Sequence, residues 1–448
     1  MGTVMEQIHL GDHFDYGKLF RFTLPSIGMM VFTSLYGVVD GFFVSNFAGK
    51  DAFAAVNLVW PVFMLLSVLG FMLGTGGNAI ISRLLGQNDG KKANEVFSML
   101  IWITVGAGIA LVAGGLLLLK PLLVKMGAEG ELLSLAMLYG SILFPVIPAG
   151  LLQVEFQTFL ITAEKPRMGF RVTLAAGIAN MVLDALFIGV FRWGITGAAA
   201  ATVAGQCIGG LVPLVYFSRR NTSLLRLGKF YYDRKAFLWT LANGSSELLS
   251  SVSMSLVTII YNWQLMRYIG ENGVAAFGVL MYVNFIFISC FIGYGIGCAP
   301  LFGYHYGAEN YPELKNLLRK SLMIIGAFSV LMTVLAETTA PALASVFVSY
   351  DPELKEITIQ AFRIYCISFL LCGFNIFGSS LFTSLGNAPV SAGISFFRTM
   401  VCEVAAVLIL PKLLGIEGIW LSVLAAEAVA GALTAFFVMK FRGKYRYY

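Results

Sequence analysis

The sequence predicts an all-α membrane protein whose twelve transmembrane helices form two six-helix bundles. Of its 448 residues, 58% are hydrophobic and only 12% are charged, and the mean hydropathy is +0.82. A soluble chain of this length carries about 25% charged residues, and a bilayer explains the deficit. Since a spanning helix needs roughly 20 mostly apolar residues, the chain has material for about a dozen of them.

Apolar runs separated by polar turns place these helices along the chain. We expect them at residues 16–46, 52–84, 94–119, 130–162, 168–190, 195–218, 236–266, 273–304, 316–346, 354–385, 390–411 and 417–439. Several runs are longer than a straight crossing requires, which predicts tilt or extension beyond the lipid. Pro25 and Pro61 are predicted kink points of the first two helices, because proline removes a backbone donor.

The distribution of Lys and Arg predicts the orientation. With the N-terminus inside, 21 basic residues fall on the inner side and 7 on the outer side, while Arg363 and Arg398 fall within helices. Because inner loops of membrane proteins are enriched in Lys and Arg, both termini are expected in the cytoplasm of a bacterial or archaeal cell. The first fifteen residues lack the pattern of a cleaved signal, so the first helix is expected to direct insertion into the inner membrane.

Composition and motifs also disfavour several classes of function. The net charge of +6 comes from basic residues in short loops, so nucleic acid is not an expected partner. No GxxxxGK[ST] loop occurs, which disfavours ATP-driven transport by this chain alone. No cluster of His or Cys ligands and no nucleophile beside a base is visible, so an enzyme is not expected. The six cysteines are interpreted as packing residues within apolar runs: Cys207, Cys290, Cys298, Cys366, Cys372 and Cys402.

An internal repeat predicts the two bundles. Residues 1–218 and 236–448 are expected to form one bundle each, joined by a basic cytoplasmic linker at 219–235. At an offset of 221 residues the glycines of the first half fall on glycines of the second. The matched positions are Gly49, Gly74, Gly76, Gly86, Gly194 and Gly197 with Gly270, Gly295, Gly297, Gly307, Gly415 and Gly418. Because each half holds six helices, the halves share one orientation, as in two-bundle transporters.

The chain resembles the multidrug and toxic compound extrusion (MATE) family along essentially its whole length. The resemblance lies in Pro25, in the stretch VDGFFVSNFAGKDAFAAVNL (Val39–Leu58) and in a glycine-rich second helix that ends in LLGQND. It implies two lobes around a V-shaped central cavity and export of organic compounds in exchange for Na+ or H+. A monomer in the lipid bilayer is expected, with no cofactor beyond the coupling ion. The resemblance does not identify the substrate.

Polar side chains in the first half form a candidate ion site. A charge at the membrane centre costs at least about 2.5–3.5 kcal/mol, so each buried carboxylate needs a reason. At a rise of about 1.5 Å per residue, Asp40, Asp184 and Thr202 all fall in the outer half of the membrane. Asn180 precedes Asp184 by four residues, and Tyr36 precedes Asp40 by four, so each pair shares a helix face. Carboxylate, amide and hydroxyl oxygens suit a small hard cation.

The resemblance assigns the same residues. One branch of the family holds its cation with an Asp on the first helix, an Asn and an Asp on the fifth and a Thr on the sixth. The matching positions are Asp40, Asn180, Asp184 and Thr202, which implies a Na+ site in the first bundle. A proton would compete for the same oxygens. The alternative from the residues alone is that the two aspartates are a polar pair that only stabilises the bundle.

The second half offers fewer candidates. Glu247 lies near mid-membrane in the seventh predicted helix, and we expect it either to contact substrate or to make structural hydrogen bonds. Some branches of the family also use an Asp on the tenth helix, where this chain has Asn375; this departure weakens the case for a second coupling site. Arg398 is expected to be structural or to reach the inner surface with its long side chain.

Several further residues have open roles. Buried partners are needed for Glu155, Arg363, Glu403 and Glu427, whereas His9, His13 and His305 are interpreted as loop residues. Met and aromatic side chains either line a promiscuous cavity or face lipid, and these are Met29, Phe32, Tyr36, Trp60, Met64, Tyr261, Met281 and Phe285. Within transport, the alternative function is a lipid-linked oligosaccharide flippase; outside transport, it is a membrane receptor or channel.

Overall fold

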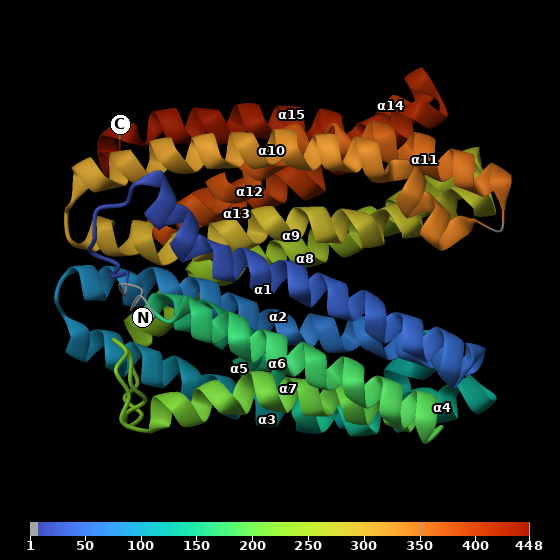
Figure 1. Ribbon diagram of the computed structural model, residues 1–448, viewed down its shortest axis with the longest axis horizontal. Coiled ribbons are helices and arrows are strands. Elements are labelled where there is room, and N and C mark those ends of the chain that lie inside the picture. Colours follow the sequence, from blue (N-terminus) through green and yellow to red (C-terminus); the bar gives the residue numbers. More distant parts are fainter. Residues whose placement is uncertain (1–7, 350, 448) are drawn as a thin grey trace, which may run out of the picture.

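The computed structural model describes residues 8–349 and 351–447, and these are helical along nearly their whole length (Figure 1). The first half contains α1 (Tyr16–Phe43), η1 (Val44–Ala48), α2 (Lys50–Gly86), α3 (Gly90–Lys125), α4 (Gly130–Leu143), η2 (Phe144–Val146), α5 (Ile147–Thr162), α6 (Pro166–Asp184), η3 (Ala185–Val190) and α7 (Ile195–Ser218). The second half contains α8 (Arg234–Tyr268), α9 (Glu271–Gly307), α10 (Tyr311–Val348), α11 (Pro352–Cys366), α12 (Phe369–Ser384), α13 (Ala388–Phe396), η4 (Phe397–Glu403), α14 (Val404–Leu414), α15 (Ile416–Lys440) and α16 (Arg442–Tyr445).

These elements produce the predicted twelve-helix, two-bundle arrangement. Among the described residues, ten helices are long and apolar enough to cross a membrane, and α11 with α12 forms an eleventh, bent span. The twelfth helix is α8, which is 35 residues long but carries Asn243, Ser245, Ser246 and Glu247 in its middle. The helices extend a few residues beyond most predicted boundaries, because their last turns continue past the apolar runs.

The structure places the largest break where no proline stands. The axes of α11 and α12 differ by 52° across Ile367 and Ser368. By contrast, α1 continues past Pro25 and α2 continues past Pro61 as uninterrupted helices. Kinks at these two prolines therefore remain predictions, whereas the bend in the tenth span is a feature that proline positions did not indicate.

Backbone geometry repeats at the same offset as the sequence. Gly49 (φ 98°) and Gly270 (φ 86°) both precede a long helix in a conformation that side chains disfavour. Asn88 (φ 60°) and Glu309 (φ 54°), also 221 positions apart, both take the left-handed conformation after the second helix of each half. The two halves therefore share local turn geometry as well as glycine positions, as a parallel structural repeat requires.

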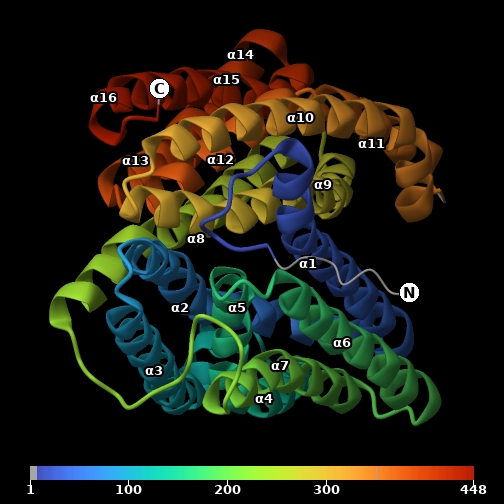
Figure 2. The same ribbon diagram turned by 60° about the vertical axis from the view of Figure 1, so that its left-hand side comes forward.

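The helices form two layers, with α2–α7 on one side and α8–α15 on the other (Figure 1). Helix α1 lies between them: it packs against α9 of the second bundle and against α6 of the first, and Figure 2 shows it crossing from one to the other. The start of α1 and the end of α15 lie at one end of the molecule, together with the 87–89 and 219–233 loops. We call this the basic end.

Close contacts between the bundles lie in the half of each helix nearest the basic end. A Cβ atom on Gly76 would overlap the backbone of Thr240 in α8, and one on Gly244 would overlap the backbone of Met72 in α2. Further along, Gly86 and Gly307 each pack against the backbone of the opposite helix, at Tyr304 and Arg83. These glycines let α2 approach α8 and α9 at backbone distance, as small residues do between membrane helices.

Residues 8–15, the N-terminal strap, cross the basic end from one bundle to the other. At its start the Glu164 carboxylate accepts a hydrogen bond from the Leu10 N–H (2.7 Å) and contacts His9 Nδ1 (2.8 Å). At its end the Glu313 carboxylate accepts from the Phe14 N–H (2.9 Å) and contacts His13 Nδ1 (2.7 Å). Glu164 follows α5 and Glu313 lies in α10, so the strap connects the two bundles.

Other contacts fix the strap. Lys320 Nζ donates to the Phe14 carbonyl (2.6 Å), and the Phe14 ring packs edge-on against His305. Partial burial opposes ionisation of Asp12, but hydrogen bonds from Lys18 and the His9 N–H, together with nearby positive charge, outweigh it and lower the pKa of that carboxyl. The interpretation of His305 as a loop residue was wrong: it is buried in the last turn of α9, because that helix continues to Gly307.

The strap yields a test of how the basic end is held. Glu313→Gln keeps the shape of the side chain but removes its charge and one acceptor oxygen. Hydrogen bonds to charged groups contribute about 1.5–3 kcal/mol, so amide exchange within residues 8–14 should become roughly 10- to 100-fold faster. Hydrogen-exchange mass spectrometry measures this, with Glu309→Gln in the neighbouring exposed loop as the matched control. Equal exchange in both variants would show that Glu313 does not anchor the strap.

Candidate functional site

The carboxyl groups of Asp40 and Asp184 lie next to each other inside the first bundle. They are close enough to interact directly, although they are 144 positions apart in the chain. Asp40 is in the last turn of α1, and Asp184 is the last residue of α6 and is 0% exposed. Helices α1 and α6 thus bring together two acidic groups that the sequence places at similar depth.

Glycine packing sets the distance between the helices that carry these groups. Gly177 of α6 lies directly against the rings of Phe32 and Tyr36 on α1. Gly205 of α7 lies against the Cβ atom of Asn180, which brings α7 beside α6. A larger residue at either glycine would push its partner helix away, so the two glycines position the aspartate pair.

A tyrosine connects the pair to the sixth span. The Tyr139 hydroxyl of α4 lies within hydrogen-bonding reach of Thr202 on α7, and the Tyr139 side chain is close to both Asp40 and Asp184. Asn180 and Thr202 are themselves buried. The structure therefore gathers all four predicted ion-site residues in one region of the first bundle and adds Tyr139, which sequence reasoning did not single out.

The oxygens of this site lack protein partners. Asp40 Oδ1, Asn180 Oδ1 and both carboxylate oxygens of Asp184 are buried without a hydrogen-bond donor among the described residues. Buried polar atoms are almost always satisfied, so four orphaned oxygens in one place call for a bound cation or proton. The donor set is all oxygen, which fits Na+ or a proton and does not fit a soft metal. Among the described residues no group of three His, Cys, Asp or Glu side chains forms a transition-metal site.

The element that follows Asp184 is unusual. Residues Ala185–Val190 form a π-helical segment, directly after the acidic side chain. Such insertions are rare and often accompany functional sites, because the extra residue reorients the side chains before it. Nothing in the apolar sequence ALFIGV signals this change of helix type.

Other polar side chains lie along the inside of the same bundle. Tyr36 lies beside Gln153 of α5, and both oxygens of Glu155, two residues further along the same helix, are buried without a partner among the described residues. The side chain of Thr104 in α3 is beside Glu155. Of these, the sequence indicated Tyr36 and left the role of Glu155 open; it gave no signal for Gln153.

In the second bundle, Glu247 is half-buried and lies one turn after Gly244, where α8 crosses α2. No hydrogen bond or ion pair to it is found within the part of the chain that the structure describes. Asn243, four residues earlier and so on the same face, is buried with both amide atoms unsatisfied. This pair presents polar groups close to the boundary between the bundles.

Arg398 does not reach the inner surface; it forms a buried ion pair. Its Nη2 atom lies 2.6 Å from Glu427 Oε1, and its Nε donates to the same oxygen at 2.8 Å. The other oxygen of Glu427 accepts from Asn375 Nδ2 (2.6 Å), and Thr434 donates to Asn375 Oδ1 (2.9 Å). The possibility that Arg398 extends to the surface was therefore wrong, because a buried carboxylate is nearer.

Two further charged residues of the second bundle, Glu403 and Arg363, have different surroundings. Glu403 lies near both Arg398 and Glu427, so one guanidinium faces two carboxyl groups. Arg363 Nε lies 3.9 Å from Glu337 Oε2 and neither side chain is buried, so this pair is longer and more open than the Arg398–Glu427 pair. Asn375 stands where an Asp would repel Glu427, so this position belongs to a structural network.

The predicted cavity residues divide into three groups by exposure. Met29 packs on Gly169 of α6 and is 1% exposed, and Tyr261 stacks on Phe277 and is also 1% exposed. In this conformation both lie inside their bundles. Met64 and Phe285 are exposed, at 41% and 50%. The remaining members are half-buried: Phe32, Tyr36, Trp60 and Met281.

Two parallel repeats of six spans, with an unsatisfied acidic site inside one of them, define a two-bundle membrane transporter. A family model described as MatE matches residues 25–186 and again residues 248–409, one match in each half. The chain belongs to the MatE family. Its membership extends across both bundles and agrees with the resemblance seen in the sequence.

Individual relatives agree with this assignment. Multidrug export protein MepA of Staphylococcus haemolyticus is 25% identical over 438 residues, which are 96% of each chain. MepA of Staphylococcus aureus strain MSSA476 is 24% identical over 425 residues, covering 95% of this chain and 93% of that protein.

Solved structures share the fold. The outward-facing conformation of a multidrug resistance MATE family transporter of the MOP superfamily superposes with a TM-score of 0.92 at 25% identity, covering 99% of this chain and 100% of that one. A MATE crystal structure in complex with MaL6 gives a TM-score of 0.92 at 24% identity, covering 97% and 98%.

The Arg398 network yields a stability prediction. Arg398→Met leaves the Glu427 carboxylate buried without its counter-charge, which typically costs about 3–5 kcal/mol. The unfolding temperature (Tm) in detergent should therefore fall by several degrees. The double variant Arg398→Met/Glu427→Met should recover most of this loss in Tm. Lys91→Met, which breaks the exposed Lys91–Glu95 pair at the start of α3, is the control and should change little. If Arg398→Met unfolds like the wild type, the ion pair has no structural role.

Proposed function

We propose that this protein is a secondary active multidrug exporter that moves organic, mainly cationic, compounds out of the cell in exchange for Na+ or H+. The observation that carries the proposal is the Asp40–Asp184 pair, whose buried oxygens have no protein donor. The MepA relatives are described as multidrug export proteins, which supports the same substrate class. Na+ or a proton would satisfy the oxygens of this pair.

Alternating access is the proposed mechanism, with residues 1–218 and 236–448 as the moving bundles and 219–235 as their linker. The close glycine contacts lie near the basic end, which supports a cavity that opens toward the opposite end in this conformation. The basic loops are proposed to lie in the cytoplasm, because inner loops carry the excess of Lys and Arg. In that orientation the cavity faces outward, and both termini are cytoplasmic.

The coupling step follows from the position of Asp40. Binding of Na+ or a proton neutralises part of the charge between α1 and α6, so these helices can pack more closely. Because α1 also packs against α9 of the other bundle, a change at Asp40 is transmitted to the contact between bundles. The ion can drive the cycle only if it prefers one of the two conformations.

Charge in the cavity accounts for the proposed preference for cations. Glu247 and Asn243 lie near the boundary between bundles, and the structure describes no counter-ion beside Glu247. The half-buried and exposed aromatic and Met side chains supply an apolar surface that suits substrates of varied shape. Tyr36, Phe32 and Met64 are the residues proposed to contact substrate in the first bundle.

The coupling site is tested by Asp40→Asn and Asp184→Asn. Each variant should abolish gradient-driven drug efflux while the protein remains folded and inserted. The double variant should be little worse than either single one, because two residues of one site are not additive. Efflux is measured in proteoliposomes with imposed Na+ or pH gradients, together with thermal stability in detergent as Na+ is added. Asp51→Asn, an exposed acid in the first turn of α2 and at the same end of the bundle as the pair, is the control.

The outcomes separate the possible ions. Saturating Na+ at about 100 times Kd stabilises the folded protein by about 2.7 kcal/mol, so Na+ coupling predicts a rise in Tm that both variants lose. If efflux fails in the variants while the wild type shows no Na+ stabilisation, the coupling ion is H+. Normal efflux by both single variants would remove the site from the mechanism.

Glu247 is tested by substrate charge. Glu247→Gln should lower the rate for monovalent cationic dyes by roughly tenfold, since a lost charge interaction of about 1.4 kcal/mol corresponds to that factor. Neutral dyes of similar size should be transported at nearly the wild-type rate in the same vesicles. An equal loss for both dye classes would assign Glu247 to structure or to coupling instead of substrate contact.

A further inference from the structure

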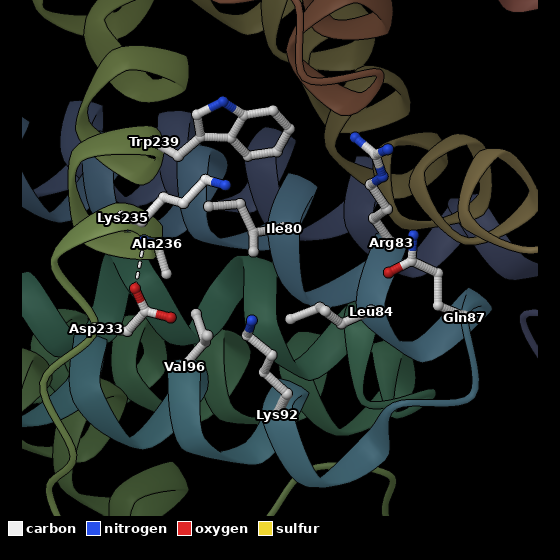
Figure 3. Close-up of a pocket in the computed structure, with 10 residues that line it drawn as sticks. All are labelled: Ile80, Arg83, Leu84, Gln87, Lys92, Val96, Asp233, Lys235, Ala236 and Trp239. Carbon is white, nitrogen blue, oxygen red and sulfur yellow. Dashed lines mark hydrogen bonds between the residues drawn. The ribbon is translucent and has the colours of Figure 1, made fainter.

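A pocket of about 280 Å³ lies at the basic end, where the start of α8 meets α2 and α3 (Figure 3). Its walls come from both bundles: Arg83 and Ile80 belong to α2, Lys92 and Val96 to α3, and residues 233–239 to the start of α8. The pocket therefore exists as a unit only while the two bundles are together at this end.

Three cations face this pocket. In Figure 3, Lys92 and Lys235 extend toward its middle from opposite sides, and the Arg83 guanidinium lies beyond Ile80. The structure describes no salt bridge for any of the three. Arg83 instead lies over the ring of Trp239 at 5.7 Å and over that of Tyr306 at 4.9 Å.

One carboxylate also lines the pocket. Asp233 uses Oδ1 to accept the N–H of Ala236 (3.0 Å) and so caps the start of α8. Because this carboxylate already serves the helix N-terminus, it neutralises the three cations only in part. The pocket therefore has an excess of positive charge, which favours an anionic ligand.

Apart from Gln87, the rest of the wall is apolar. Ile80, Leu84, Val96 and Ala236 form it, together with Trp239, which is 37% exposed. Tryptophan is enriched at the level of lipid headgroups, where one part of the ring meets hydrocarbon and another meets water. Cations beside an apolar wall at this depth match a lipid with a phosphate headgroup better than they match a freely diffusing anion.

We propose that this pocket binds the phosphate headgroup of an anionic phospholipid from the adjoining leaflet, and that the bound lipid holds the two bundles together at the basic end. Arg83, Lys92 and Lys235 contact the phosphate, and Trp239 covers the glycerol region. Basic pockets between membrane helices on the cytoplasmic side bind such headgroups in other proteins. The effect on the bundles rests on the alternating-access function proposed above, whereas the binding itself does not.

Lipid retention tests the binding. Purified protein is exchanged into detergent micelles with phosphatidylglycerol or phosphatidylcholine, and native mass spectrometry counts the lipids that stay bound. The triple variant Arg83→Gln/Lys92→Gln/Lys235→Gln should lower the affinity for phosphatidylglycerol on the order of 100-fold, because each basic residue near a lipid surface contributes about 1 kcal/mol, or roughly fivefold. Phosphatidylcholine should be retained weakly by both proteins.

The control removes the same charge elsewhere on the basic end. Arg171→Gln/Lys229→Gln/Lys315→Gln replaces three exposed residues outside the pocket and should keep phosphatidylglycerol affinity within about threefold of the wild type. The single variant Lys235→Gln, at an exposed position, repeats the test if the triple variant folds poorly. Equal losses in the pocket and control triples would overturn the site. Displacement of the lipid by millimolar inorganic phosphate would overturn its assignment to a lipid.

Spin labels test the effect on the bundles. In a cysteine-free protein, labels at Lys91 and Lys315 report the separation of the bundles at the basic end. Phosphatidylglycerol should shift the distance distribution toward the shorter population, and the pocket triple should abolish that shift. If the lipid is retained but the label distances do not shift, the lipid binds without holding the bundles together. A loss of drug transport without any loss of bound lipid would count against the proposed transport function and not against the lipid site.

Discussion

Close backbone contact between glycine-bearing helices is the constraint on which the rest of this structure depends. In a bilayer there is little hydrophobic gain from packing one apolar helix on another, so association relies on surfaces that fit closely. Gly76 and Gly244 bring α2 against α8, and Gly86 and Gly307 bring α2 against α9. At these four positions the two bundles therefore meet through backbone surfaces.

The Glu427 carboxylate in the second bundle has protein partners, whereas the aspartate pair in the first bundle has none among the described residues. In the second bundle, Arg398 and Asn375 satisfy both oxygens of Glu427, and a network of this kind fixes the packing of its helices. In the first bundle, Asp40 and Asp184 face each other without a cation from the protein. A carboxylate without a partner is costly in a low-dielectric site, so it persists where an exchangeable ion completes it. The contrast supports a coupling role for the first pair and a structural role for the second.

Much of the fold was predictable because apolar runs, glycine spacing and charge bias are properties of the chain itself. Twelve spans and their pairing into halves followed from these patterns. The bend between α11 and α12 and the π-helical segment after Asp184 were not predictable, since no proline marks either one. Counting residues along each helix placed Asp40 and Asp184 at the same depth in the membrane. It could not show that the two side chains are in contact, because the rotation of each helix about its axis depends on its neighbours.

Side-chain partners across helices were the least predictable feature. Tyr139 beside Thr202 and Glu427 beside Arg398 depend on contacts between spans that are distant in sequence. The same applies to Met29 and Tyr261, whose apolar character suits a cavity and a bundle interior equally well. Only the three-dimensional arrangement assigns them to the interior in this conformation.

The most direct measurement is the protonation of the aspartate pair itself. Infrared difference spectra, recorded on the protein in lipid as Na+ is added or pH is changed, resolve the C=O stretch of protonated carboxyl groups. If Asp40 and Asp184 form the ion site, the wild type shows a carboxyl band that changes with the ion and is absent from both Asp40→Asn and Asp184→Asn. The same band in both variants, with unchanged ion dependence, would contradict the assignment and move the coupling site to another carboxyl group.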